Sequence, residues 1–225
     1  MSQSSAAVSY SGDAETFSAD RHFLGLVQRV ASGSVITRIS LDDHGEVVID
    51  PNLRRYSCAL TNPTLFYRSP AASFRVAPNQ SVSVLDHGRA RDLAELLWIA
   101  AYHAANGRLL TGCSKYDVVR LQYWPNLSRL PQSPNTMRLC AFLSRRPSAI
   151  HLARKLVGVD EGEAYSFYSA GLSAGALELV SRAPARNQGE PDSAPDNAPE
   201  AAPATAAQPS DRSLLRLIWN KVSRL

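Results

Sequence analysis

A proline- and alanine-rich segment near the end of the chain constrains its fold more than any other feature. Residues 183–209 contain six prolines and nine alanines, but no aromatic residue and no Leu, Ile or Val. Such a segment buries too little apolar surface to offset the conformational entropy that ordering would cost. We therefore predict a disordered linker with a net charge of −3, from one Arg against two Asp and two Glu.

Hydrophobicity returns in residues 210–225, which read SDRSLLRLIWNKVSRL. Apolar residues recur at helical spacing from Leu214 to Leu225, the basic residues lie mostly off that stripe, and Ser210 or Asp211 can cap the start. The segment carries four positive charges and one negative charge, or +3. A helix this short is marginal alone in water, so we expect it to fold against a surface.

Three surfaces suit this predicted amphipathic helix. A groove on a partner protein would take its apolar stripe, an anionic membrane would attract its cations, and the body of the same chain lies within reach of the linker. The predicted contact residues are Leu214, Leu215, Ile218, Trp219 and Val222, with Arg216, Lys221 and Arg224 supplying electrostatic attraction.

The rest of the chain predicts an α+β fold. After a disordered N-terminus at residues 1–15, we expect a domain at 16–115 that combines helices with an antiparallel sheet. Its predicted helices are residues 16–31 and 90–105. Its predicted strands are residues 35–41, 46–49 and 55–60, and a hairpin of 74–77 with 81–85.

A second predicted domain covers residues 116–182. It begins with a strand at 118–124, followed by a helix at 135–145. A short helix that opens at Pro147–Ser148 carries Ile150, Leu152, Ala153 and Leu156 as its apolar positions. A third helix over 161–170 is capped by Asp160, and a strand follows at 176–180.

Residues 137–180 of this second domain read MRLCAFLSRRPSAIHLARKLVGVDEGEAYSFYSAGLSAGALELV. The run resembles a winged-helix unit, with three helices, a tight turn between the second and third, and then a strand. The resemblance implies either DNA binding through the third helix or a protein-interaction module.

The charges of this unit favour the second use. The third helix begins with Asp160, Glu161 and Glu163 and contains no Lys or Arg, so its entry point would repel phosphates. Its aromatic residues are expected in the core. The candidate nucleic-acid contacts are Arg145, Arg146, Arg154 and Lys155, which suit a solvated face equally well.

Motifs that carry chemistry are missing from the sequence. The three cysteines are far apart and form no CxxC, the five histidines have no metal-ligand spacing, and neither GxxxxGK[ST], GxGxxG nor GxSxG occurs. The first residues also lack the features of a signal peptide, and no run of about 20 apolar residues occurs. We therefore expect no enzyme, cofactor or metal, and a cytoplasmic location.

These observations together predict a bacterial-type, non-enzymatic regulatory or adaptor protein of the signalling kind. It would act through protein–protein contacts, with the C-terminal helix recruiting a partner or holding the chain at the inner face of the membrane. The alternative is a winged-helix transcriptional regulator that binds DNA. The sequence leaves the partner, any small ligand and the oligomeric state open.

Overall fold

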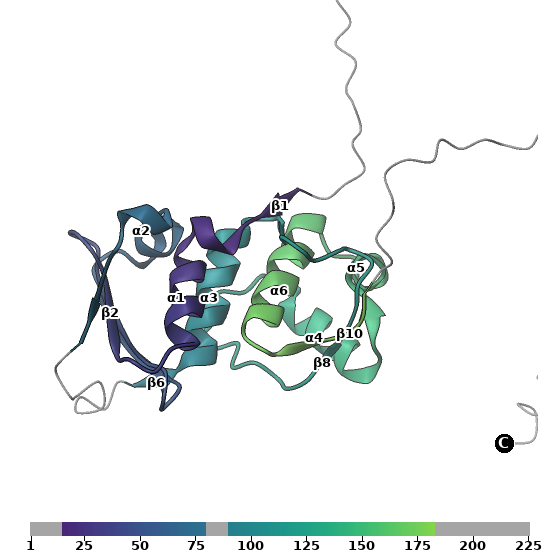
Figure 1. The fold of residues 1–225 in the computed structure, drawn as a ribbon. Coiled ribbons are helices and arrows are strands. Elements are labelled where there is room, and N and C mark those ends of the chain that lie inside the picture. Colours follow the sequence, from purple (N-terminus) through teal and green to yellow (C-terminus); the bar gives the residue numbers. More distant parts are fainter. Residues whose placement is uncertain (1–14, 80–89, 183–225) are drawn as a thin grey trace, which may run out of the picture. The chain divides into compact units, whose positions relative to one another are not determined.

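The computed structural model describes residues 15–79 and 90–182 (Figure 1). The helices are α1 (Phe23–Ala31), α2 (Pro63–Arg68), α3 (Leu93–Ala105), α4 (Thr136–Arg145), α5 (Ile150–Val157) and α6 (Glu161–Ser173), with short 3-10 helices η1 (Ala19–Arg21) and η2 (Ala71–Ser73). The strands are β1 (Thr16–Phe17), β2 (Thr37–Leu41), β3 (Gly45–Asp50), β4 (Arg55–Leu60), β5 (Arg75–Pro78), β6 (Arg91–Asp92), β7 (Leu109–Leu110), β8 (Val118–Leu121), β9 (Ser148–Ala149) and β10 (Leu177–Ser181). The predicted α+β class is confirmed. Among the described helices, none has the length and apolar character that crossing a bilayer requires.

The N-terminal half contains an antiparallel sheet of five strands in the order β5-β2-β3-β4-β6. The turn between β2 and β3 holds Asp43 and Gly45 at positive φ, as turn chemistry requires. The inward-facing residues Ile39, Val47, Ile49 and Tyr56 are fully buried. They lie against the helices that cover this face of the sheet.

Helix α3 lies between the five-stranded sheet and α6 (Figure 1). Asp92 caps its start by accepting a hydrogen bond from the backbone N–H of Ala94, and Asn106 ends it in the left-handed conformation. Because α1 and the sheet cover one side and α6 the other, nine residues of α3 are buried, from Leu93 to Ala105.

The C-terminal half is built around α6. Helices α4 and α5 pack on it, and a three-stranded antiparallel sheet in the order β10-β8-β9 completes the layer. Residues 164–171 form an unbroken buried run of more than two helical turns. Every side of the middle of α6 is therefore covered by protein.

Buried serines join the two halves across the end of α3. The backbone N–H of Gly107 donates to Ser166 Oγ at 2.9 Å, and that of Leu110 donates to Ser169 Oγ at 3.2 Å. Within the predicted domain at 16–115, the parallel pair β1–β7 joins residues far apart in sequence. The described residues form one compact unit, so the boundary predicted between residues 115 and 116 falls inside that unit.

Some predicted elements have different limits in the structure. The helix predicted over 16–31 begins only at Phe23, because Thr16 and Phe17 pair with β7 and His22 is extended. The helix predicted over 90–105 begins at Leu93, and the strand predicted over 118–124 ends at Leu121.

The strand predicted over 74–77 is present as β5, which pairs with β2. Its expected partner, residues 81–85, lies outside the described residues, as do the predicted linker (183–209), the predicted tail helix (210–225) and most of the predicted N-terminal segment.

Candidate functional site

The four basic residues predicted as nucleic-acid contacts have different surroundings. Arg145 and Arg146 are exposed at the end of α4, where the Arg146 guanidinium lies 4.9 Å from the centre of the Phe142 ring. Lys155 is exposed on α5. Arg154 is already paired with Glu161. Three of the four cations are therefore exposed, and Arg154 is partly buried in its ion pair.

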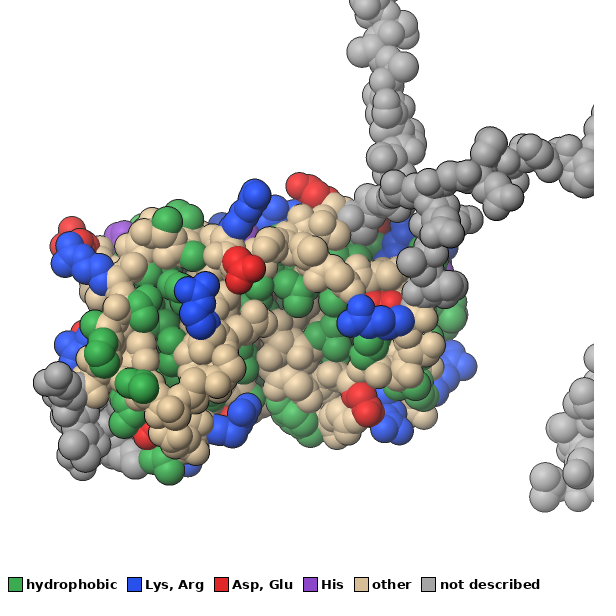
Figure 2. All heavy atoms as spheres, in the orientation of Figure 1, with side chains coloured by type: hydrophobic (Ala, Val, Ile, Leu, Met, Phe, Trp, Pro, Cys, Tyr) green, Lys and Arg blue, Asp and Glu red, His purple; other side chains and the backbone are tan. Residues whose placement is uncertain are grey.

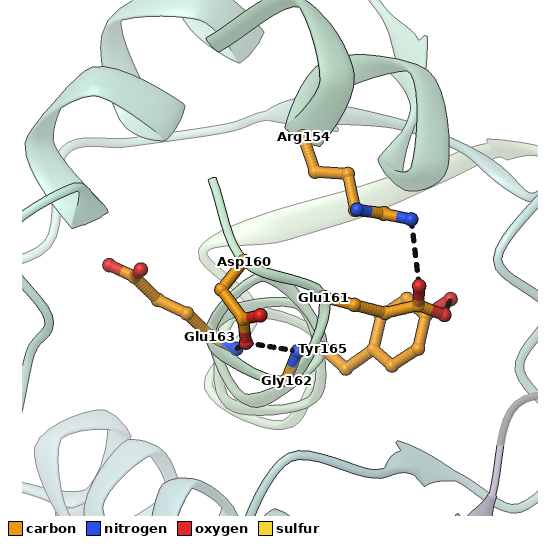
Figure 3. A network of polar contacts seen from close by, with 6 residues as sticks. All are labelled: Arg154, Asp160, Glu161, Gly162, Glu163 and Tyr165. Atoms are coloured by element: carbon orange, nitrogen blue, oxygen red, sulfur yellow. Dashed lines mark hydrogen bonds and ion pairs between the residues drawn. The ribbon is translucent and has the colours of Figure 1, made fainter. Parts of the chain in front are cut away.

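The pairing of Arg154 belongs to a network at the start of α6 (Figure 3). Arg154 Nη2 lies 2.7 Å from Glu161 Oε2, and the Tyr165 hydroxyl donates a hydrogen bond to the other oxygen of the same carboxylate. Burial and this carboxylate raise the pKa of Tyr165. Asp160 caps the helix by accepting from the N–H groups of Gly162 and Glu163. The network fixes α5 to the first turn of α6.

The third helix of the winged-helix resemblance is α6, and it is the most buried helix of this half. Ala164, Phe167, Tyr168 and Ala170 are at most 1% exposed. Its aromatic residues lie in the core, as predicted. A helix that reads bases must enter the major groove, which a helix covered by α3, α4 and α5 does not do.

The outward side of α5 carries two exposed leucines one helical turn apart. Leu152 is 44% exposed and Leu156 is 56% exposed. The sequence placed both among the apolar positions of this helix. In the structure, however, the body is contacted by Ile150, Ala153 and Val157, which are at most 8% exposed. The helix therefore has one apolar side toward the core and a second apolar stripe toward solvent.

Basic and aromatic residues lie next to these leucines on α5 and in the segment that contacts His151. Tyr116 lies edge-on to the His151 ring at 4.8 Å, and Lys115 Nζ lies 5.5 Å from the centre of the Tyr116 ring. Lys155 follows His151 by one helical turn. We call the resulting surface the α5 face; it consists of Lys115, Tyr116, His151, Leu152, Lys155 and Leu156. Figure 2 shows basic and hydrophobic side chains next to each other on the face of the molecule that it draws.

The α5 face is electropositive. Burial and the neighbouring cations Lys155, Lys115 and Arg154 lower the pKa of His151, which favours its neutral imidazole. The charge of Arg154 is largely balanced by Glu161, so the exposed Lys155 supplies positive potential beside the leucines.

A separate polar hollow of about 280 Å3 lies where α2, α3 and α6 meet, lined in part by Arg68, His103, Glu163 and Ser166. The His103 ring stacks on Tyr67, and burial and Arg68 lower the pKa of His103. Glu163 accepts two hydrogen bonds from Asn135, and Ser166 accepts one from Gly107. These polar groups hold the helix junction together.

Within residues 15–79 and 90–182, no group of three or more His, Cys, Asp or Glu side chains is placed to hold a metal ion. The predicted tail contacts, from Leu214 to Arg224, lie outside the described residues. Sequence reasoning missed Lys115, Tyr116 and the outward direction of Leu152 and Leu156. The available signal was Lys155 between two leucines spaced by four.

Comparison of the chain with protein-family models, with curated proteins and with solved structures found no match. The order of the C-terminal elements, three helices and then a strand, is present in α4, α5, α6 and β10. Membership of the winged-helix family stays a prediction.

Proposed function

We propose that this chain is a non-enzymatic regulatory or adaptor protein that acts through protein–protein contacts. The observation that carries the proposal is the α5 face, where Leu152 and Leu156 are half exposed one turn apart beside Lys155. Such a pair of apolar anchors on a helix is the way a helix engages a complementary surface. Solvated helix faces carry polar side chains at these positions instead.

A second contact element is assigned to residues 210–225. Their apolar stripe and their net charge of +3 suit either a groove on a partner protein or an anionic membrane surface. The acidic, proline-rich linker before them gives the helix reach. In this proposal the body presents one surface, and the tail recruits the partner or the membrane.

Deleting residues 210–225 should lower recruitment about tenfold while the body stays folded, because the apolar anchors of a contact carry most of its affinity. Recruitment is measured by quantitative pull-down from the native host and by sedimentation with anionic vesicles. The matched control exchanges two side chains, Arg216→Ile with Ile218→Arg, which keeps composition and charge but breaks the apolar stripe. It should behave like the deletion. Unchanged partner and vesicle binding by the tail-less chain would refute the tail's role.

DNA binding is the alternative, and three exposed cations near α5 are the observation in its favour. It predicts retention of duplex DNA at about 50 mM salt and steep loss of binding with added salt. Replacing Arg145, Arg146 and Lys155 with Gln should abolish that retention. Arg154 is left intact in this variant, because its removal would also leave Glu161 unpaired. Absence of duplex binding by the unmodified chain at low salt would eliminate this alternative.

A further inference from the structure

The α5 face combines three properties that together specify what it binds. The first is its pair of apolar anchors. Residues four apart on a helix have Cβ atoms about 5–6 Å apart, so Leu152 and Leu156 form a short ridge along α5. Each leucine is about half covered by the body, at 44% and 56% exposed, which holds the side chains in place. Contact with a partner therefore orders little that is not ordered already.

The second property is the sign of the charge. Lys155 is exposed and lies between the leucines in sequence, four residues after His151, whose ring contacts Tyr116. The nearby carboxylate of Glu161 is taken up by Arg154 and Tyr165. The face thus presents positive potential beside apolar surface, and it complements a segment that carries carboxylates beside apolar side chains.

The third property is the limited exposure of the leucines. A membrane-bound helix buries its apolar side about 5–10 Å into the interface of the bilayer. Side chains that are half covered by their own domain offer little apolar surface to a bilayer, whereas a ridge of two leucines fits a groove between the side chains of another helix. The limited exposure of the two leucines therefore favours a protein partner over a lipid surface at this site.

We infer that the α5 face is a docking site for an acidic amphipathic helix of a partner protein, with apolar residues spaced by four that pack on Leu152 and Leu156 and carboxylates that approach Lys155. The inference rests on the proposed adaptor function and names the partner chemistry of its body surface. It is independent of what the tail binds.

The test uses the full chain as bait for a displayed library of random peptides of about 16 residues. Selected peptides are then synthesised, and their affinity is measured by fluorescence anisotropy. We expect enrichment of Asp and Glu together with apolar residues spaced by three or four. Raising the salt from about 0.1 M to about 1 M shortens the Debye length from about 10 Å to about 3 Å, and should weaken binding severalfold.

Two variants locate the binding site. Leu152→Ser with Leu156→Ser should weaken binding about tenfold, because both anchors are lost. Lys155→Glu should weaken it about fivefold, and this effect should shrink at high salt. The matched controls are Leu53→Ser with Leu65→Ser, at similarly exposed leucines (53% and 50%), and Arg29→Glu at an exposed cation of α1. Both controls should stay within about twofold of the unmodified chain.

An empty selection, peptides without acidic character, or binding that the α5 variants leave unchanged would overturn the inference. Vesicle binding that depends on Leu152 and Leu156, without peptide binding, would assign the face to a membrane instead. Tail-dependent recruitment that survives the α5 variants would preserve the adaptor function while the docking inference fails. If the peptides still bind the α5 face but the tail deletion leaves recruitment unchanged, the docking inference holds and the proposed role of the tail fails.

Discussion

Replacing Trp98 with alanine should lower the free energy of unfolding by about 3–5 kcal/mol, the usual range for a large aromatic removed from a core. Trp98 is 1% exposed and lies on α3, the helix between the five-stranded sheet and α6. Its ring meets Phe167 of α6 edge-on at 5.9 Å, and its Nε1 donates to the carbonyl of Pro131 at 3.2 Å. The variant loses packing on α6 and leaves that carbonyl without this donor.

Urea unfolding followed by far-ultraviolet circular dichroism measures this loss. Trp124→Ala is the matched control, because Trp124 is 54% exposed and should change stability by less than about 1 kcal/mol. A loss at Trp98 no larger than at Trp124 would contradict the packing of α3 on α6.

The same measurement addresses the division of the body into two domains. Trp98 belongs to the predicted domain at 16–115, and Phe167 to the predicted domain at 116–182. Because the two rings and the buried serines Ser166 and Ser169 join these parts, we expect a single transition that shifts as a whole. Two separate unfolding transitions, of which Trp98→Ala shifts only one to lower urea, would show that the two parts unfold independently.

Local signals in the sequence were sufficient for much of the fold. Strand β4 has the predicted limits, Arg55–Leu60, and α6 begins after its predicted cap, Asp160. A capping side chain acts on backbone groups two or three residues away, so the sequence nearby determines it. Helix α2 had such a signal too: Asn62 accepts a hydrogen bond from the Leu65 N–H, and Pro63 occupies the first turn. Helix α2 was not among the predicted elements, although its cap and its proline are local signals.

The remaining differences come from long-range contacts. Thr16 and Phe17 look like the start of a helix until they pair with Leu109 and Leu110, more than 90 residues later. Likewise, the direction of Leu152 and Leu156 is decided by which side of α5 meets α4 and α6. An apolar stripe toward a partner has the same periodicity as one toward the core. This is why the sequence predicted the helix but not its exposed face.

Replacing Gly45 with alanine should be comparably severe, at about 3–5 kcal/mol, because two costs act at one position. Gly45 opens β3 with φ at +115°, a conformation that L side chains rarely adopt. A Cβ there would lie 2.1 Å from the carbonyl oxygen of Ala59 and 2.8 Å from Leu60 Cα. Both are backbone atoms of β4, so relief requires the strands to separate.

Gly112→Ala separates the two costs. Gly112 also has positive φ, at +86°, but a Cβ there would have no atom within 4 Å. It should therefore lose only the conformational part, about 1–2 kcal/mol. Urea unfolding of both variants measures the difference, which reports the clash with β4. Since β3 pairs with β2 on its other side, the damage should spread through the centre of the five-stranded sheet. Equal losses of unfolding free energy in the two variants would mean that β4 moves away from the added Cβ without an energetic cost. That result would contradict a close pairing of β3 and β4 at Gly45 and Leu60.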